Sequence, residues 1–175
     1  MELINKNKQK NKKRTSWRDV TINEYFDLTD ELNDDSIENY EKEVKLIAFV
    51  NYMTEDEVWN LNINKFRELQ VEKTWMSYFD IKKEVKFNKI TIEEKTYEID
   101  TNLQNFTIAQ YIDFQTFYAK RRTDKRVIGN ILACFILPKG KKYAEGYDIV
   151  DLVNKINNNI DILTANEILF FFLKQ

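Results

Sequence analysis

The sequence contains no histidine, one cysteine (Cys134), three glycines and one proline among its 175 residues. The lack of histidine excludes a Ser-His-Asp or Cys-His nucleophile system and, with a single cysteine, a zinc site made of Cys and His. One cysteine cannot form a disulfide within the chain. Three glycines are too few for glycine-rich phosphate-binding loops or for the many turns of an all-β chain. No catalytic signature remains after these exclusions.

Long hydrophobic runs are also missing, and neither sign of charge dominates. The longest apolar stretch near the C-terminus, 168–173, is far shorter than the about 20 residues that cross a bilayer. The N-terminus lacks the apolar run of a secretion signal. The 27 basic and 29 acidic residues nearly cancel, whereas a nucleic-acid-binding domain is normally strongly basic. We therefore expect a chain made in the cytoplasm, without a membrane segment, for which nucleic acid is not the expected partner.

Residues 1–15 form a basic segment in which lysines alternate with Asn and Gln. Such a segment cannot bury apolar surface, so we expect a disordered basic arm. It is either a solvated tail or an arm that orders against an acidic partner surface or a nucleic acid. Its candidate partner-binding residues are Lys10, Lys12, Lys13 and Arg14.

Residues 16–80 are expected to form a first helical repeat. Capping boxes, in which Thr and an acidic residue three positions later exchange hydrogen bonds with the backbone, begin helices at Thr21 and Thr54. Between them, a turn at 34–36 precedes an amphipathic helix. Its apolar face is formed by Tyr40, Val44, Ile47 and Tyr52. A further apolar pattern predicts a helix from about 63 to 77.

The pattern then changes to a period of two. Val85, Phe87, Ile90, Ile92, Tyr97 and Ile99 alternate with Lys, Thr and Glu on both sides of Glu93-Glu94-Lys95. This alternation predicts a β-hairpin within a connector at 81–102. An isolated hairpin is marginally stable, so it must pack on helices or pair with another chain.

Residues 103–175 are expected to form a second helical repeat. A capping box at Thr107 begins its first helix, and a very apolar helix at 127–137 ends before the single proline. Asp148 caps a short helix, and a further capping box at Thr164 begins the terminal one. The fold class is therefore α+β, mainly helical, with two similar helical repeats joined by a β-hairpin.

The duplication is indicated by a constant spacing between similar residues. At an offset of 86, residues 21–28 line up with 107–114, and the same offset pairs Leu46 with Leu132, Phe49 with Phe135 and Val50 with Ile136. After an insertion of 13 residues the offset becomes 99, and 60–63 meets 159–162. Identity that persists over several elements favours a repeat over a chance likeness of apolar helices.

The two repeats differ in charge. Between Asp19 and Glu57 there are thirteen acidic residues against two lysines. The second repeat carries the remaining candidate partner-binding residues in two basic loops: Lys120, Arg121, Arg122 and Arg126, and Lys139, Lys141 and Lys142. This asymmetry could pair the halves, drive head-to-tail contact between copies, or leave solvated faces without partners.

Two other features have structural explanations. The carboxylates at 34–35 and 55–57 coincide with helix caps and lack the spacing of a calcium loop, so we expect no metal site. Cys134 lies among apolar residues and is expected to be a buried small hydrophobe.

Four strings carry a resemblance to a known family: WRDVTINEYFDL, AQYIDFQTFY, CFILPKGKKYAEGYDIVDLV and NEILFFFLKQ. Over about 17–173 the chain resembles small tail-morphogenesis proteins of phages that infect Bacteroidales, including crAss-like phages. Members are labelled tail assembly chaperones or small tail and ring components, and neither kind is an enzyme. The resemblance therefore implies no catalytic residue and no cofactor. The basic N-terminal extension departs from the family and suits an incorporated virion subunit better than a transient chaperone.

The sequence and the resemblance together predict a non-enzymatic virion structural protein of the tail or portal–tail region. It would act through protein–protein assembly, with other tail or portal proteins and as a homo-oligomer that could close into a ring. The alternative is a cytoplasmic tail assembly chaperone, and a more distant one is a nucleic-acid-binding accessory protein.

Overall fold

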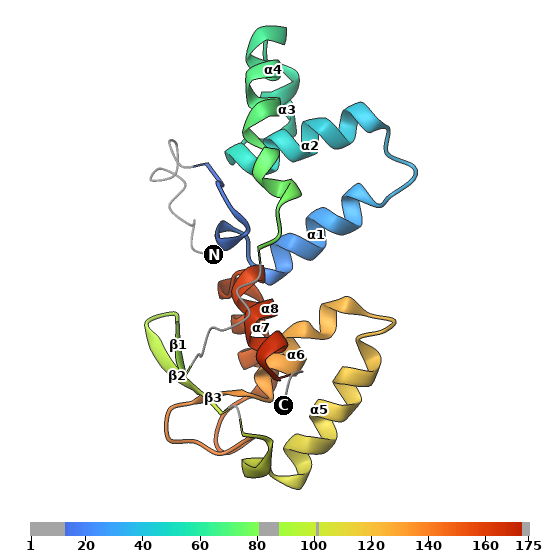
Figure 1. Cartoon of the computed structure of the whole chain (residues 1–175). Coiled ribbons are helices and arrows are strands. Elements are labelled where there is room, and N and C mark those ends of the chain that lie inside the picture. Colours follow the sequence, from blue (N-terminus) through green and yellow to red (C-terminus); the bar gives the residue numbers. More distant parts are fainter. Residues whose placement is uncertain (1–12, 81–87, 101, 173–175) are drawn as a thin grey trace. The chain divides into compact units, whose positions relative to one another are not determined.

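The computed structural model describes residues 13–80, 88–100 and 102–172 (Figure 1). The fold is mainly helical with one small antiparallel sheet, as predicted. The chain divides into two compact units, which in the described part consist of 13–20 with 27–79 and of 21–26 with the residues from Asp80 onward. The hairpin connector therefore belongs to the second unit, and helix α1 (Ile22–Leu32) crosses the boundary.

The first unit is built on three helices, α2 (Asn39–Asn51), α3 (Glu55–Trp59) and α4 (Ile63–Glu72). The predicted capping box at Thr54 begins α3, and the Asn62 side chain accepts a hydrogen bond from the Lys65 amide at the start of α4. The three helices bury a small apolar core. Its members are Val44, Ile47, Ala48, Val58 and Leu69.

Two single 3₁₀ turns complete the first unit, η2 (Trp17–Asp19) and η3 (Thr74–Ser77). The Trp17 ring packs edge-on against Trp75, with 5.2 Å between centroids, and lies 5.8 Å from the ring of Phe79. The segment before the first helix is thereby joined to the segment after α4, because the contact of the buried Trp17 with the partly buried Trp75 contributes both apolar burial and ring contact.

The second unit is organised around α6 (Ile128–Ala133), which contacts α5 (Ile108–Lys120), α7 (Ile149–Asn159) and α8 (Ile162–Phe172). Two 3₁₀ turns, η4 (Leu103–Asn105) and η5 (Lys125–Val127), precede α5 and α6. Just after α6, the fully buried Phe135 meets the rings of Phe106 and Phe114 at 5.3 and 5.2 Å.

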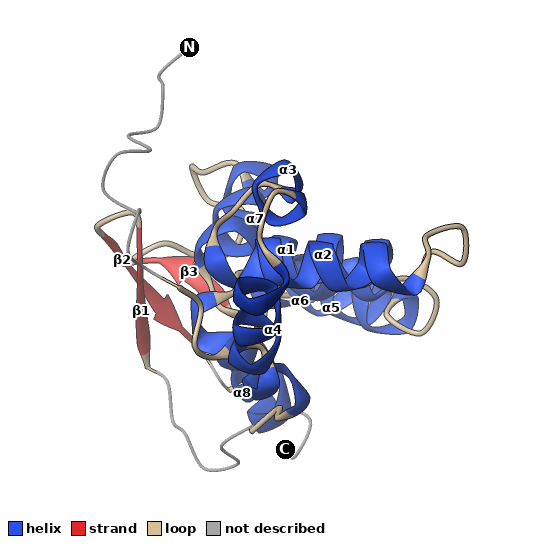
Figure 2. Cartoon of the chain, turned by 90° about the horizontal axis from the view of Figure 1, so that it is seen from above, coloured by secondary structure: helices blue, strands red, loops and turns tan. Residues whose placement is uncertain are grey.

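The second unit also holds the sheet, which consists of β1 (Lys89–Ile92), β2 (Lys95–Ile99) and β3 (Ile136–Pro138) (Figure 2). The β1–β2 hairpin was predicted, and its two turn residues, Glu93 and Glu94, have φ angles of 49° and 64°. Positive φ at both central residues is the geometry of a type I′ turn, which matches the twist of the strands. Val85 and Phe87 lie outside the described residues.

The prediction of one helix over 127–137 is wrong in its second half. Helix α6 ends at Ala133, and β3 pairs antiparallel with β2, with Ile136 opposite Ile99. The strand satisfies backbone groups that the hairpin would otherwise leave open at its edge. Residues 131–136 are all buried, and a continuous apolar run does not distinguish a buried helix from a buried strand.

The predicted capping box at Thr164 is also wrong. Helix α8 begins at Ile162, and the cap is Asp161, whose carboxylate accepts hydrogen bonds from the amide and the hydroxyl of Thr164. Asp and Thr are both good capping residues, and Asp161 is the one that directly precedes the first residue of the helix. The caps at Thr107 and Asp148 are confirmed.

The duplication stays a prediction, and the bounds of the helices can be compared with it. An offset of 86 brings the start of α1 onto that of α5, and an offset of 99 brings the start of α4 onto that of α8. The local hydrogen bonds agree. Thr21 and Thr107 both open a capping box, and Asn62 and Asp161 both accept from the amide three residues later. The main difference is at the end of the second helix: α2 continues to Asn51, whereas α6 ends at Ala133 and its equivalent last turn is replaced by β3, just before the insertion.

Candidate functional site

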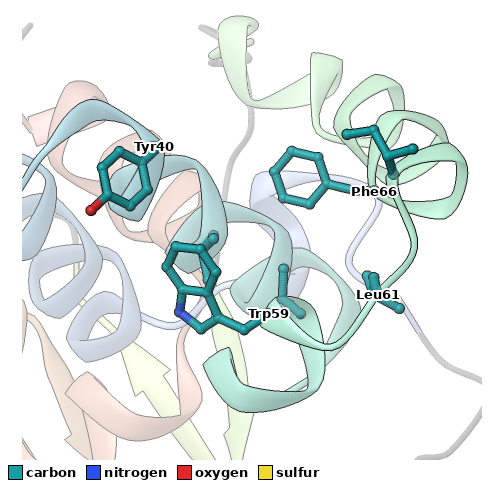
Figure 3. A pocket seen from close by; sticks show the side chains of 7 residues that line it. Tyr40, Trp59, Leu61 and Phe66 are labelled. Atoms are coloured by element: carbon teal, nitrogen blue, oxygen red, sulfur yellow. The ribbon is translucent and has the colours of Figure 1, made fainter.

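The first unit has an open apolar groove of about 230 Å³ between α2, α3 and α4 (Figure 3). The Tyr40 and Trp59 rings meet edge-on at 5.7 Å, and Phe66 lies on the other side of the groove. The residues that line it are Tyr40, Val44, Val58, Trp59, Leu61, Ile63 and Phe66.

The rim of this groove is formed by apolar side chains that remain exposed to solvent. Tyr40 and Trp59 are each 52% exposed, and Ile63 is 60% exposed, while Val44 and Val58 close the floor. Large apolar side chains that are grouped and exposed mark interaction surfaces more often than isolated ones do.

Acidic residues stand beside the groove. Glu55, Asp56 and Glu57 fill the first turn of α3, where the helix dipole favours negative charge, and Glu38 and Glu41 exchange capping hydrogen bonds at the start of α2. The latter two carboxylates raise the pKa of the Tyr40 hydroxyl by charge repulsion. The carboxylates at 55–57 therefore serve as helix caps, as predicted, and give the groove an acidic border.

A second exposed apolar surface, the α5 face, lies on the second unit. Ile108 is 81% exposed, Ile112 56% and Tyr111 48%, and the last two lie one helical turn after Ile108. Tyr118 continues the same side of the helix near its C-terminal end and is 38% exposed. Phe114, on another side of α5, is buried.

The basic arm behaves differently from the prediction where it is described. The Arg14 guanidinium is 5% exposed and lies between the rings of Phe49 and Tyr52, 3.9 and 4.0 Å from their centroids. It also donates a hydrogen bond to the Phe49 carbonyl. Arg14 therefore anchors the chain within the first unit rather than facing a partner. Lys13 pairs with Glu72 at 2.8 Å, and Lys10 and Lys12 lie outside the described residues.

The loop between α5 and α6 gathers four of the predicted basic residues. Lys120 lies 3.6 Å from Asp124, Arg121 is half-buried and Arg122 is exposed. Arg126 has its guanidinium 5.8 Å from the centre of the Phe26 ring. Three further candidates, Lys139, Lys141 and Lys142, are exposed in the segment after β3.

The buried thiol shows no sign of reactivity. Cys134 is fully buried, and burial raises the pKa of its thiol to about 12. The nearby Tyr143 hydroxyl donates a hydrogen bond to Asp113 at 2.7 Å, and burial raises its pKa as well. A thiol that stays protonated at neutral pH is a poor nucleophile, so Cys134 acts as the predicted small hydrophobe.

Within the described parts of the chain, no group of three or more Cys, Asp or Glu residues is arranged to hold a metal ion. No helix there is long and apolar enough to cross a membrane. Comparisons of the chain with protein-family models, with curated proteins and with solved structures gave no match.

The basic loops were predictable from the sequence, whereas the two apolar surfaces were not. The spacing of Tyr40 and Val44 predicts one apolar helix face, yet Tyr40 is 52% exposed and Val44 is buried. The spacing of Ile108, Tyr111 and Ile112 likewise gives no sign of their exposure. One signal was present in the sequence: α3 and α4 are short helices that still carry Trp59, Leu61, Ile63 and Phe66, more apolar surface than a unit this small can cover.

Proposed function

We propose that this chain is a non-enzymatic structural protein of a phage virion, in the tail or portal–tail region, and that it acts through protein–protein assembly. The observation that carries the proposal is the pair of exposed apolar surfaces, the groove of the first unit and the α5 face of the second. The resemblance to tail-morphogenesis proteins supplies the biological setting.

The physical argument is that neither surface is explained by the fold of a single chain. Exposed Ile108, Ile112, Ile63 and Trp59 side chains add nothing to the stability of a monomer and promote nonspecific association. Their burial against partner chains would make them stabilising, and aromatic and branched side chains are typical of the centres of protein interfaces. The acidic border of the groove and the basic loop at 120–126 would then provide register and steering.

The experiment is quantitative mass spectrometry of purified particles of the phage that encodes the chain, compared with the lysate of infected cells. We expect the chain in the particles at a fixed ratio to the portal and tail proteins. Its presence in the lysate and absence from the particles would contradict the proposal and would identify an assembly chaperone instead.

A matched binding measurement addresses the remaining alternative. Titration of the purified chain with duplex DNA at low and at physiological salt should give no specific binding. Tight binding that falls steeply with salt, the signature of phosphate contacts, would identify a nucleic-acid-binding protein.

A further inference from the structure

In the second unit, the start of α1 docks on the helices α7 and α8. The internal repeat relates the two sides of this contact to the two exposed apolar surfaces, the α5 face and the groove. The start of α1 packs against the junction of α7 and α8: the Ile22 amide donates to the Ile160 carbonyl at 3.1 Å, and Thr21 forms a bridge with Asp161. The Asn23 side chain donates to Asn158 at 2.8 Å. Ile22 is 1% exposed in this contact.

A second part of the same contact lies one turn further along α1. Phe26 is 5% exposed, and the guanidinium of Arg126, in η5 just before α6, stands over its ring. The docked side of α1 is therefore the face that carries Ile22 and Phe26. The receiving side consists of the start of α6 and the α7–α8 junction.

At the offset of 86, the residues on the docked side of α1 have their equivalents on α5. Ile22 corresponds to Ile108, Tyr25 to Tyr111 and Phe26 to Ile112. These are the three most exposed residues of the α5 face. Ile22 and Phe26, which are buried in the first copy of the motif, thus have exposed equivalents in the second.

The residues of the receiving side have their equivalents in the groove of the first unit. By the offset of 86 for the start of α6 and of 99 for the α7–α8 junction, the equivalent pairs are Arg126 and Tyr40, Asn158 and Trp59, Ile160 and Leu61, and Ile162 and Ile63. All four first-repeat residues line the groove. The groove is the first-repeat equivalent of the surface on which α1 docks in the second unit.

We propose that the α5 face of one copy docks into the groove of a second copy, repeating between chains the contact that α1 makes within the second unit. The proposal rests on the proposed function and names a partner for its two surfaces. Each copy would use one surface to dock and the other to receive, so the contact is head-to-tail. Such a contact generates a ring if it closes and a filament if it does not.

Where the proposed contact differs from the internal one, side chains on both sides of the contact are replaced by more apolar ones. The polar pair Asn23 and Asn158 becomes Ala109 and Trp59, so a small side chain faces the large ring. Arg126 over Phe26 becomes Tyr40 over Ile112, which replaces a cation over a ring by an apolar contact. The proposed interface is more apolar than its template, as expected of a contact between chains that must form without a covalent link.

Charge favours the same pair of surfaces. The first turn of α3, one turn before Trp59 of the groove, carries Glu55, Asp56 and Glu57, of which Glu55 is paired with Lys45 at 2.7 Å, and α5 ends in the basic loop that contains Arg121 and Arg122. Two identical surfaces of one sign would repel each other, whereas a docking surface with a basic end and a receiving surface with an acidic border attract.

The test uses two variants of the full chain. The face variant carries Ile108→Asp and Ile112→Asp, and the groove variant carries Trp59→Ala and Ile63→Asp. All four side chains are exposed, so both variants should keep the far-ultraviolet circular dichroism and unfolding midpoint of the wild type. In analytical ultracentrifugation we expect the wild type to form a concentration-dependent series of oligomers. Each variant alone should show an association constant weaker by about tenfold or more.

Mixing the two variants is the decisive measurement. The face variant retains an intact groove, and the groove variant retains an intact α5 face, so an equimolar mixture should form a 1:1 dimer that does not grow. A twofold-symmetric contact through either surface predicts no such rescue. Val71→Asp on α4 and Val150→Asp on α7 are the matched controls, since both side chains are exposed, at 67% and 69%, and lie outside the two surfaces.

The inference would be overturned by a wild type that stays monomeric at all concentrations, by a mixture that stays monomeric, or by control variants that lose association as strongly as the test variants. These outcomes are independent of the particle measurement. A chain that is monomeric in solution but present in virions contradicts the head-to-tail contact alone, whereas oligomers of a chain that is absent from virions contradict the proposed function.

Discussion

At two pairs of equivalent positions the second repeat is packed more tightly than the first. Phe135 is fully buried, while its equivalent Phe49 is half-buried and covered on one side by Arg14. Gly129 on α6 lies so close to α7 that a Cβ there would stand 2.0 Å from Asn157 Oδ1. Its equivalent is Glu43, which pairs with Lys73 near the surface.

The difference is explained by what covers each set of helices. In the second unit, β3 continues from α6 and pairs with β2, and η4 supplies Phe106 to the ring cluster around Phe135. The first unit has no described strand, and its helices α3 and α4 leave the groove open. One helical pattern therefore gives a closed core when other elements cover it and a binding surface when they do not.

Truncation of the equivalent phenylalanines should break this comparison most clearly. We expect Phe135→Ala to lower the free energy of unfolding by about 3–5 kcal/mol, because it empties a fully buried site between two rings. Phe49→Ala should cost about half as much, since its ring is partly exposed. Denaturant unfolding measures both, and equal losses would contradict the difference in packing.

Arg14→Ala should be the next largest effect. The variant loses a guanidinium that lies between two aromatic rings and a hydrogen bond to the Phe49 carbonyl, and we expect about 2 kcal/mol less stability of the first unit. Lys13→Ala is the matched control, because its pair with Glu72 is largely exposed and should contribute less than about 0.5 kcal/mol.

The Arg14→Ala and Lys13→Ala variants also distinguish a role in folding from a role in binding a partner. If Arg14→Ala left stability unchanged and reduced incorporation into particles, the sequence-based assignment of Arg14 to a partner-binding arm would be right after all.

Local signals in the sequence were sufficient for the helix starts at Thr54 and Thr107 and for the hairpin. The caps at Thr54 and Thr107 depend on hydrogen bonds within four residues, and the turn at Glu93-Glu94 separates two alternating strands. Such features are decided by near neighbours and can be predicted from them.

Features that depend on distant neighbours could not be predicted. Whether residues 134–138 continue a helix depends on the free edge of β2, which lies 35 or more residues earlier in the chain. Whether Tyr40 or Ile108 is buried depends on which elements cover α2 and α5, and the apolar spacing is the same in either case. The candidate site was missed for that reason, while the repeat that relates its two halves was visible in the sequence.

Charge reversal tests the acidic–basic contrast between the repeats and should have a smaller effect. We expect Arg121→Glu with Arg122→Glu to weaken self-association by about three- to tenfold at low salt, mainly through a slower association rate. Arg126 is left unchanged because its guanidinium lies over Phe26 in the fold. The measurement is sedimentation at several salt concentrations.

The salt dependence is the internal control of that experiment. Because exposed charges are screened over about 8–10 Å at moderate salt, the variant and the wild type should converge as salt is raised. A difference that persists at about 0.5 M salt would show that the two arginines make contacts other than steering ones.

The smallest expected effect is at Cys134, whose equivalent in the first repeat is Ala48, also buried. Cys134→Ala should change the free energy of unfolding by less than about 1 kcal/mol at pH 7, since it exchanges one small buried group for another. The native thiol should resist alkylation at pH 8 and react once the chain is unfolded. Rapid alkylation of the native protein would contradict its burial.

The difference in free energy of unfolding between the wild type and Cys134→Ala should grow at alkaline pH. Burial raises the thiol pKa from its ordinary value of 9.0 to about 12, so the unfolded chain releases the thiol proton at lower pH than the folded one. The stability that the protonated thiol contributes is complete below pH 9.0 and is lost as the pH rises toward about 12. At pH 10 the wild type should therefore lose about 1 kcal/mol that Cys134→Ala keeps, which denaturant unfolding of both proteins at pH 7 and pH 10 measures. Parallel losses in the two proteins would place the alkaline sensitivity in other groups, such as the buried Tyr143 hydroxyl.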